Sequence, residues 1–174
     1  MTNDQIDEMN DAWRRELPAL DPAPIEIVGR AIVIAQHLER SVNRALEPFG
    51  LSLGQYDILA TLRRQGPRGK MTPTQLMKCV MLSSGGMTNR VDRLEQAGLI
   101  ERGEDPDDRR GVVVGLTVKG CALIEAATAA RFEEARQSLP DLNGKQSREL
   151  AAVLREWLRK LVEPRPGGFP EGSA

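Results

Sequence analysis

Four consecutive segments between residues 72 and 117 constrain the fold most strongly. The first is a short helix, because Thr72 can act as its N-cap, Pro73 takes the first helical position and Gln75 completes a capping box. A second helix is expected over 83–97. A short capped helix followed closely by a second helix has the spacing of a helix-turn-helix.

The third and fourth segments form a β-hairpin directly after the second helix. Two β-capable runs, 99–104 and 112–116, flank a turn rich in Asp, Pro and Gly at 105–111. Its tip carries Arg109 and Arg110 beside four acidic residues. One interpretation is a wing whose arginine enters a minor groove. The other is a self-paired, solvent-exposed loop.

Amphipathic helices flank this module on both sides. The sequence predicts a mainly α fold with a small β-hairpin, in which N- and C-terminal dimerisation helices flank a winged helix-turn-helix module. Apolar stripes on the helices at 25–47 and 144–162 exceed what a small module can cover, so a second copy of the chain is expected to cover them. The other expected helices are 4–16, 53–64 and 118–138. The chain is expected to divide into an extra helix and connector (1–24), a dimerisation helix (25–50), the DNA-binding module (51–117), C-terminal dimerisation helices (118–163) and a disordered tail (164–174).

Composition excludes several function classes. The chain has 174 residues with 24 Lys and Arg against 25 Asp and Glu, so no uniformly basic coat is expected. Aromatic residues make up 3%, too few for a single-strand stacking platform. Two cysteines and one histidine argue against a disulfide framework or a zinc site and favour a cytoplasmic setting. No cofactor, metal or membrane span is expected, and no nucleophile motif or phosphate loop indicates an enzyme.

The centre of the chain concentrates positive charge. Between Asp57 and Asp92 there is no acidic residue, which suggests phosphate contacts, although a solvated face is the simpler alternative. The six basic residues there are Arg63, Arg64, Arg68, Lys70, Lys78 and Arg90.

The second helix has a face suited to reading bases. On a helical wheel, Met87, Val91 and Leu94 point to the core. The opposite face carries hydrogen-bonding side chains, namely Thr88, Asn89, Asp92, Arg93 and Gln96. Ser83, Ser84 and Gly85, with Gly86, allow the backbone to approach a phosphate. The expected DNA contacts are Ser83, Ser84, Gly85, Thr88, Asn89, Arg93, Arg109 and Arg110.

These segments resemble the MarR family of winged-helix transcriptional regulators. The resemblance rests on the runs PTQL at 73–76, SSGGMTNRVDRLE at 83–95, GLIER at 98–102, DPDDRRG at 105–111 and LTVKG at 116–120. It implies a homodimer that places one recognition helix per subunit in successive major grooves of a duplex operator. It also implies a pair between Asp92 and Arg110 that links helix and wing.

A narrower resemblance concerns the urate-responsive branch of that family. It rests on an extra N-terminal helix and on four residues: Trp13, Asp57, Arg90 and Arg102. It implies that Trp13 and Arg102 hold a small organic anion of the urate or purine type, while Asp57 and Arg90 couple it to the reading helix. The helical wheel supports part of this independently. It places Arg90 beside the apolar face of the helix, where its charge needs a nearby carboxylate, and Asp57 is a candidate. Without ligand, Arg102→Ala is expected to affect DNA binding little, because Arg102 lies at the base of the wing.

Alternative functions remain at this point. A redox-sensing regulator would use Cys79 or Cys121, although both fit small core positions. A regulator of the same family that responds to phenolic ligands is a second alternative, and an enzyme is a remote one. For Asp57 and Arg90 the alternative is a structural ion pair, and for Trp13 it is an anchor for the added helix.

Overall fold

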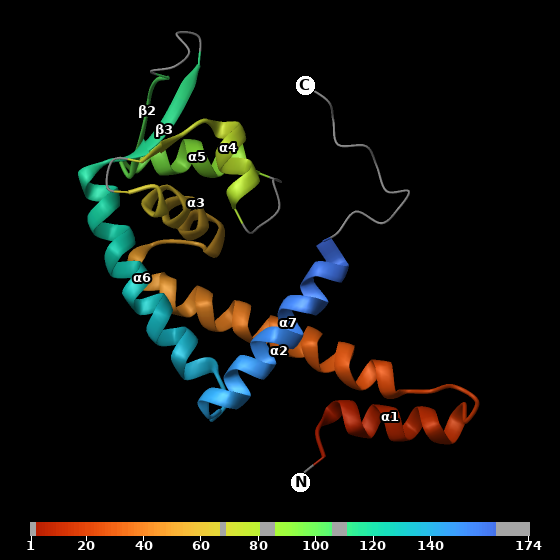
Figure 1. The fold of residues 1–174 in the computed structure, drawn as a ribbon. Coiled ribbons are helices and arrows are strands. Elements are labelled where there is room, and N and C mark those ends of the chain that lie inside the picture. Colours follow the sequence, from red (N-terminus) through yellow and green to blue (C-terminus); the bar gives the residue numbers. More distant parts are fainter. Residues whose placement is uncertain (1–2, 67–68, 81–85, 106–110, 163–174) are drawn as a thin grey trace. The chain divides into compact units, whose positions relative to one another are not determined.

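The computed structural model describes residues 3–66, 69–80, 86–105 and 111–162 (Figure 1). It divides into two compact units, Met1–Ser138 and Leu139–Ala174. The expected fold class is confirmed: helices dominate, and a small antiparallel sheet accompanies them. No helix within the described ranges is both long and apolar enough to cross a bilayer.

The N-terminal helices α1 (Gln5–Glu16) and α2 (Ala23–Leu46) lie close to their expected positions. Asp4 caps α1 in a capping box with Asp7. Helix α2 starts two residues earlier than the predicted 25, because proline is compatible with the first helical turn. A single 3-10 turn, Glu47–Phe49, follows α2, and Gly50 ends it with a left-handed φ of 64°.

Helices α3 (Leu53–Arg64) and α4 (Pro73–Cys79) begin where their caps predict. Ser52 and Thr72 each form a complete capping box with the glutamine three residues later. The prediction for α5 (Met87–Gln96) was wrong at its start. Its N-cap is Gly86, with a left-handed φ of 75°, and not Ser83 or Ser84, because a residue in that conformation cannot continue a right-handed helix.

The sheet has three strands in the order β1-β3-β2, all antiparallel. The predicted hairpin is confirmed as β2 (Ile100–Glu104) and β3 (Val112–Leu116). Strand β1 (Lys70–Met71) was not predicted from the sequence, because two residues are too short to show an alternating pattern. Its pairing with β3 places Lys70 opposite Gly115, which is in turn opposite Glu101.

One hydrophobic core joins these elements, and α6 (Val118–Ser138) packs along both α2 and α3. The last apolar residues of α2, Val42 and Leu46, are buried in it together with Ile124 and Ala127 of α6. The rest of the α2 stripe stays exposed, including Val28, Ile32 and Leu38. The predicted stripe therefore serves two surfaces: its C-terminal part is buried in the core of the first unit, and its N-terminal part stays exposed among the described residues.

A hydrogen-bonded joint connects the end of α5 to the start of α6. The Thr117 hydroxyl donates to the Gly98 carbonyl at 2.7 Å and accepts from the Gly120 N–H at 3.0 Å. The Lys119 Nζ donates to the Ala97 carbonyl at 2.8 Å, where a cation suits a helix C-terminus. A Cβ on Gly120 would lie 1.9 Å from the carbonyl oxygen of Leu99, so this approach requires glycine.

The second unit contains α7 (Gly144–Val162), which matches its predicted bounds. None of its residues is buried. Its exposed apolar side chains recur at helical spacing: Leu150, Val153, Leu154, Leu158, Leu161 and Val162. The predicted disordered tail, 164–174, lies outside the described residues.

Candidate nucleic-acid interface and anion site

The α5 helix presents the side chains that the wheel predicts on two of its faces. Met87, Val91 and Leu94 are buried in the core. Thr88, Asn89 and Arg93 are exposed. The exposed set offers a hydroxyl, an amide and a guanidinium, which are groups that bind base edges in a major groove.

Asp92 lies on the outward side of α5, as the wheel predicts, and its side chain is 44% exposed, but its carboxylate pairs with a residue of β2. Together with Glu95 it forms a flank of α5 that faces β2. The Arg102 guanidinium donates to both carboxylates, to Glu95 at 2.6 Å and to Asp92 at 2.5 Å. The hydrogen bond to Asp92 raises the pKa of Arg102 above its usual value. The expected partner of Asp92, Arg110, lies outside the described residues.

Several predicted DNA contacts fall in the parts of the chain that are not described. These are Ser83, Ser84 and Gly85 before α5, and Arg109 and Arg110 at the hairpin tip. Their role as DNA contacts remains a prediction.

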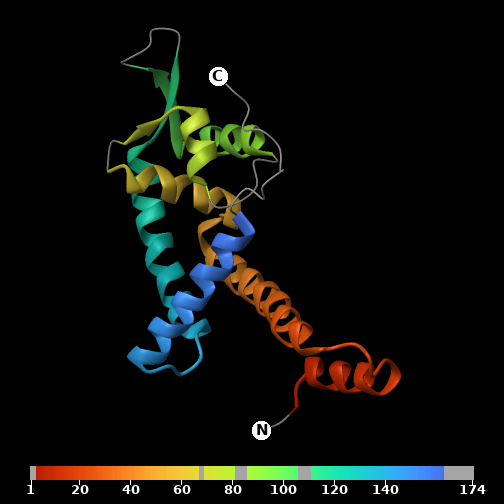
Figure 2. The same ribbon diagram turned by 45° about the vertical axis from the view of Figure 1, so that its right-hand side comes forward.

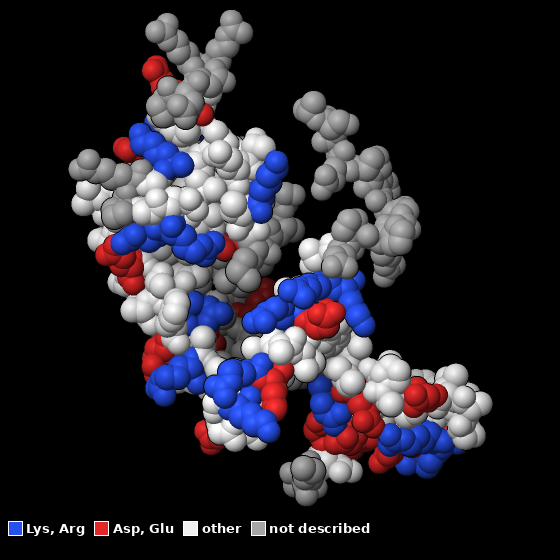
Figure 3. Space-filling model, viewed as in Figure 1, with Lys and Arg blue, Asp and Glu red and all other residues white. Residues whose placement is uncertain are grey.

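The basic stretch is less uniform in space than in sequence. Arg63 forms an ion pair with Glu125 of α6 at 2.8 Å, and Arg64 donates to the Thr61 hydroxyl. Lys70 and Lys78 are exposed. On the face shown in Figure 3, the basic side chains over the winged-helix part stand apart on largely uncharged surface. Of the described cations in this stretch, Arg63 is therefore paired with a carboxylate, while Lys70 and Lys78 stay exposed.

Asp57 and Arg90 are positioned by facing helices. Asp57 is buried in α3. Arg90 of α5 lies against α3: a Cβ added to Gly54 of α3 would be 2.8 Å from Arg90 Nε. Gly54 and Asp57 are three residues apart and share one face of α3. Both Asp57 and Arg90 have interaction partners. The fold thus brings the Arg90 side chain to the helix face that carries Asp57.

Trp13 is not near the other three residues of the predicted anion site. It lies on α1 with 49% of its surface exposed. Helix α1 packs on α2 near the start of that helix, where Arg14 pairs with Glu26 and Arg30 pairs with Asp4. Helices α3–α5 lie beyond the other end of α2 (Figures 1 and 2). One chain alone therefore does not assemble the predicted quartet.

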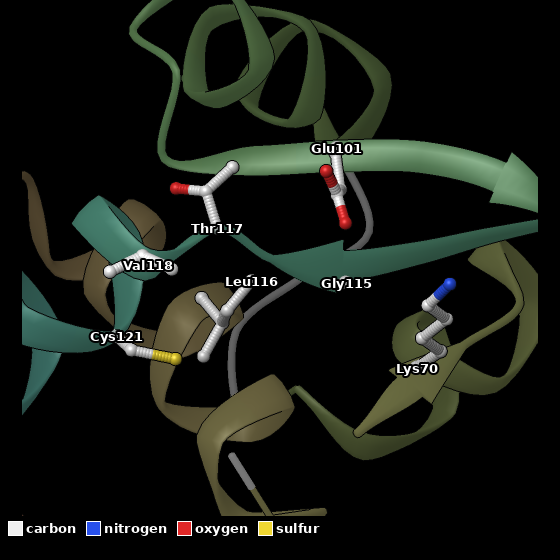
Figure 4. Close-up of a pocket in the computed structure, with 7 residues that line it drawn as sticks. All are labelled: Lys70, Glu101, Gly115, Leu116, Thr117, Val118 and Cys121. Carbon is white, nitrogen blue, oxygen red and sulfur yellow. The ribbon is translucent and has the colours of Figure 1, made fainter. Parts of the chain in front are cut away.

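A hollow of about 730 Å³ lies between the sheet and the start of α6. Lys70 and Glu101 lie on either side of Gly115 along its rim, and Cys121 lies at its α6 end (Figure 4). The two charged groups have opposite sign, so the hollow does not favour an anion. Cys79 is exposed, and the expectation that it is a core residue was wrong. Cys121 is partly buried against the core, as expected. No cluster of metal-ligating side chains occurs in the described part of the chain.

Comparison with known proteins identifies the family. The model of the MarR family matches residues 49–111. The transcriptional regulator PecS of Dickeya dadantii is 32% identical over 161 residues, which cover 92% of this chain and 97% of PecS. The chain belongs to the MarR family. Since PecS is a transcriptional regulator, the match supports the predicted regulatory role over an enzymatic one.

Two solved MarR-family structures contain DNA. A mutant of Escherichia coli MarR, complexed with operator DNA, is 26% identical with a TM-score of 0.64 and covers 86% of this chain and 97% of its own. Sco3205 of Streptomyces coelicolor, in complex with DNA, is 25% identical with a TM-score of 0.72 and covers 85% and 95%. The fold of this chain is therefore one that binds DNA in both of those proteins.

Proposed function

We propose that this MarR-family regulator binds a pseudo-palindromic duplex operator as a homodimer and represses transcription. The observation that carries the proposal is the arrangement of α5, where Thr88, Asn89 and Arg93 are exposed above a buried apolar face. The two-fold symmetry of a dimer matches two half-sites about one helical turn apart. The wing, which follows α5, would then reach the adjacent minor groove.

The homodimer is supported by apolar surface that is exposed in the described part of the chain. Exposed apolar side chains line much of α2, and another stripe lines α7. Burying whole helical stripes at about 25 cal/mol per Å² favours association. A second copy carries the same stripes and is the simplest partner.

We further propose that a small organic anion, urate or a related purine, releases the protein from its operator. Arg90 of the reading helix lies against the face of α3 that carries the buried Asp57, and Arg102 offers several donors to an anion. An anion beside Asp57 meets like-charge repulsion and competes for Arg90, which displaces α5. Because α1 lies away from α5 in one chain, the proposal requires Trp13 of the second copy to supply the flat face for the ring.

The experiment starts with selection of a duplex from a randomised pool by the wild-type protein. Gel-shift titrations with urate, xanthine and hypoxanthine then compare the wild type, Trp13→Phe and Trp157→Phe. Trp157 lies on α7 and serves as the matched control. We expect Trp13→Phe alone to blunt release, and a coupling of about 1–3 kcal/mol would lower operator affinity 5–150-fold. Equal release of all three proteins, or none by any purine, would contradict the anion proposal.

The same assay separates the alternative sensors. Release by a phenolic acid but not by purines would favour a phenolic ligand. Exposed Cys79 gives the redox alternative a concrete target. Oxidant titration of Cys79→Ser and Cys121→Ser would show whether either thiol controls operator binding.

A further inference from the structure

The reading helix carries two acidic residues close to the side chains that would face DNA. Asp92 follows Thr88 by four residues, and Glu95 follows Asp92 by three, so all three lie along one side of α5. Asp92 is adjacent in sequence to Arg93. Two uncompensated carboxylates here would repel the phosphates that the helix approaches, within a Debye length of about 10 Å.

Arg102 is the cation that compensates both carboxylates. It lies on β2, opposite the buried Val114 of β3, so a central strand of the sheet fixes its backbone. Its Nη1 bonds to Glu95 and its Nη2 to Asp92. The guanidinium therefore does two things at once: it cancels negative charge on α5 and ties α5 to the strand that leads into the wing.

We propose that Arg102 is a positioning residue of the DNA interface, which neutralises Asp92 and Glu95 and holds α5 against β2. The inference rests on the proposed DNA binding. It replaces the expectation that loss of Arg102 leaves DNA binding without ligand unchanged. It also gives an anion a direct route to release: an anion that captures the Arg102 guanidinium frees two carboxylates beside the operator phosphates.

The test uses the full chain and the duplex selected by the wild type, with no ligand present. Fluorescence anisotropy measures affinity for the wild type, Arg102→Gln, Arg102→Lys and the triple variant Arg102→Gln, Asp92→Asn, Glu95→Gln. Arg136→Gln is the matched control, because Arg136 forms an exposed pair with Glu133 on α6. Circular dichroism melting checks that each variant is folded.

We expect Arg102→Gln to lose about tenfold or more in affinity, while its melting temperature stays close to that of Arg136→Gln. The triple variant should regain most of that affinity, because the charges that Arg102 cancels are gone. Arg102→Lys should fall between, since it keeps the charge but not the two-armed geometry.

Two results would overturn the inference. One is wild-type affinity for Arg102→Gln, and the other is a triple variant as weak as Arg102→Gln. Failure of the proposed function looks different, because then the wild type itself would select no duplex.

Discussion

At the scale of single residues, the contact between Gly54 and Arg90 makes a sharp prediction. Alanine is favoured over glycine in a helix by about 1 kcal/mol, so Gly54→Ala should stabilise α3. When Arg90 is present, the added Cβ would lie only 2.8 Å from Arg90 Nε, so the gain in the free energy of unfolding should be lost. In an Arg90→Ala background the gain should return. Urea unfolding of the four proteins in this cycle measures the coupling, and additive effects would contradict the placement of Arg90.

Gly120 makes a second residue-scale prediction. Its Cβ position is 1.9 Å from a backbone oxygen, which cannot move aside like the end of a side chain. Gly120→Ala should therefore lower the free energy of unfolding by about 2–3 kcal/mol. Gly144→Ala is the control, because the nearest atom to its Cβ is Arg148 Nη1 at 3.6 Å. Denaturant unfolding should separate the two variants clearly, and equal stability would contradict the close approach.

At the scale of elements, α1 is attached to α2 through partly exposed ion pairs and a small apolar contact between Ile6 and Gly29. Arg30 of α2 donates to Asp4 at 2.8 Å and to Asp7 at 2.6 Å. Within α1 only Ile6 and Asn10 are buried, and the Asn10 side-chain amide has no hydrogen-bond partner among the described residues. A helix held this way should detach under conditions that leave the main core intact.

The pH dependence of this attachment follows from the two aspartates. The hydrogen bond from Arg30 holds the pKa of Asp4 below its usual 3.8. The Asp4 backbone N–H, and then Arg30, do the same for the pKa of Asp7. A lowered pKa stabilises the attached state above the unfolded value, and this stabilisation is lost as the pH falls through the folded value.

We therefore expect α1 to stay attached at neutral pH and to loosen below about pH 4. Fluorescence of Trp13 in a Trp157→Phe background reports on α1, and far-UV circular dichroism reports on the remaining helices. Arg30→Gln should loosen α1 at neutral pH and remove most of the acid transition. An unchanged acid transition in Arg30→Gln would contradict the role of this cation.

The sequence could predict the position of an element where that position is set by residues close together in the chain, but not where it is set by contacts between distant segments. Each capping box, at Ser52 and at Thr72, involves only four consecutive residues, so the starts of α3 and α4 were predicted correctly. The start of α5 depends on the backbone conformation of Gly86, which composition alone does not fix. Strand β1 exists only through its pairing with β3, and the pair of Arg63 with Glu125 spans 62 residues.

The predicted site shows the same division. The wheel correctly separated the buried and exposed faces of α5 around Met87 and Arg93. It did not show that Asp92 pairs with Arg102, because that contact depends on which strand packs beside the helix. Arg102 was singled out through the family resemblance, but its bonds to α5 required the sheet register. The separation of Trp13 from the other three residues follows from the length of α2, since α1 packs at the start of that helix and α3–α5 lie beyond its end.

At the scale of the whole molecule, the uncovered face of α2 makes the assembly testable. Ile32 is 54% exposed in the chain, and its burial would occur twice in a symmetric dimer. Ile32→Glu should weaken the dimer by about 3 kcal/mol or more. Val118→Glu is the control, since Val118 is 89% exposed at the start of α6. Analytical ultracentrifugation should find a monomer only for Ile32→Glu, and a wild-type monomer at micromolar concentration would contradict the dimer itself.

The joint between α5 and α6 has a mechanical consequence. With 21 residues at 1.5 Å each, α6 is a rod of about 30 Å. Thr117, Lys119 and Gly120 fasten its N-terminal end to Ala97, Gly98 and Leu99, directly after α5. If α6 tilts by a few degrees about a point near Ser138, its N-terminal end moves by a few ångströms. Hydrogen bonds to bases tolerate about 0.5 Å of change in length, so in the proposed operator complex a small rotation of α6 would be enough to make or break base contacts.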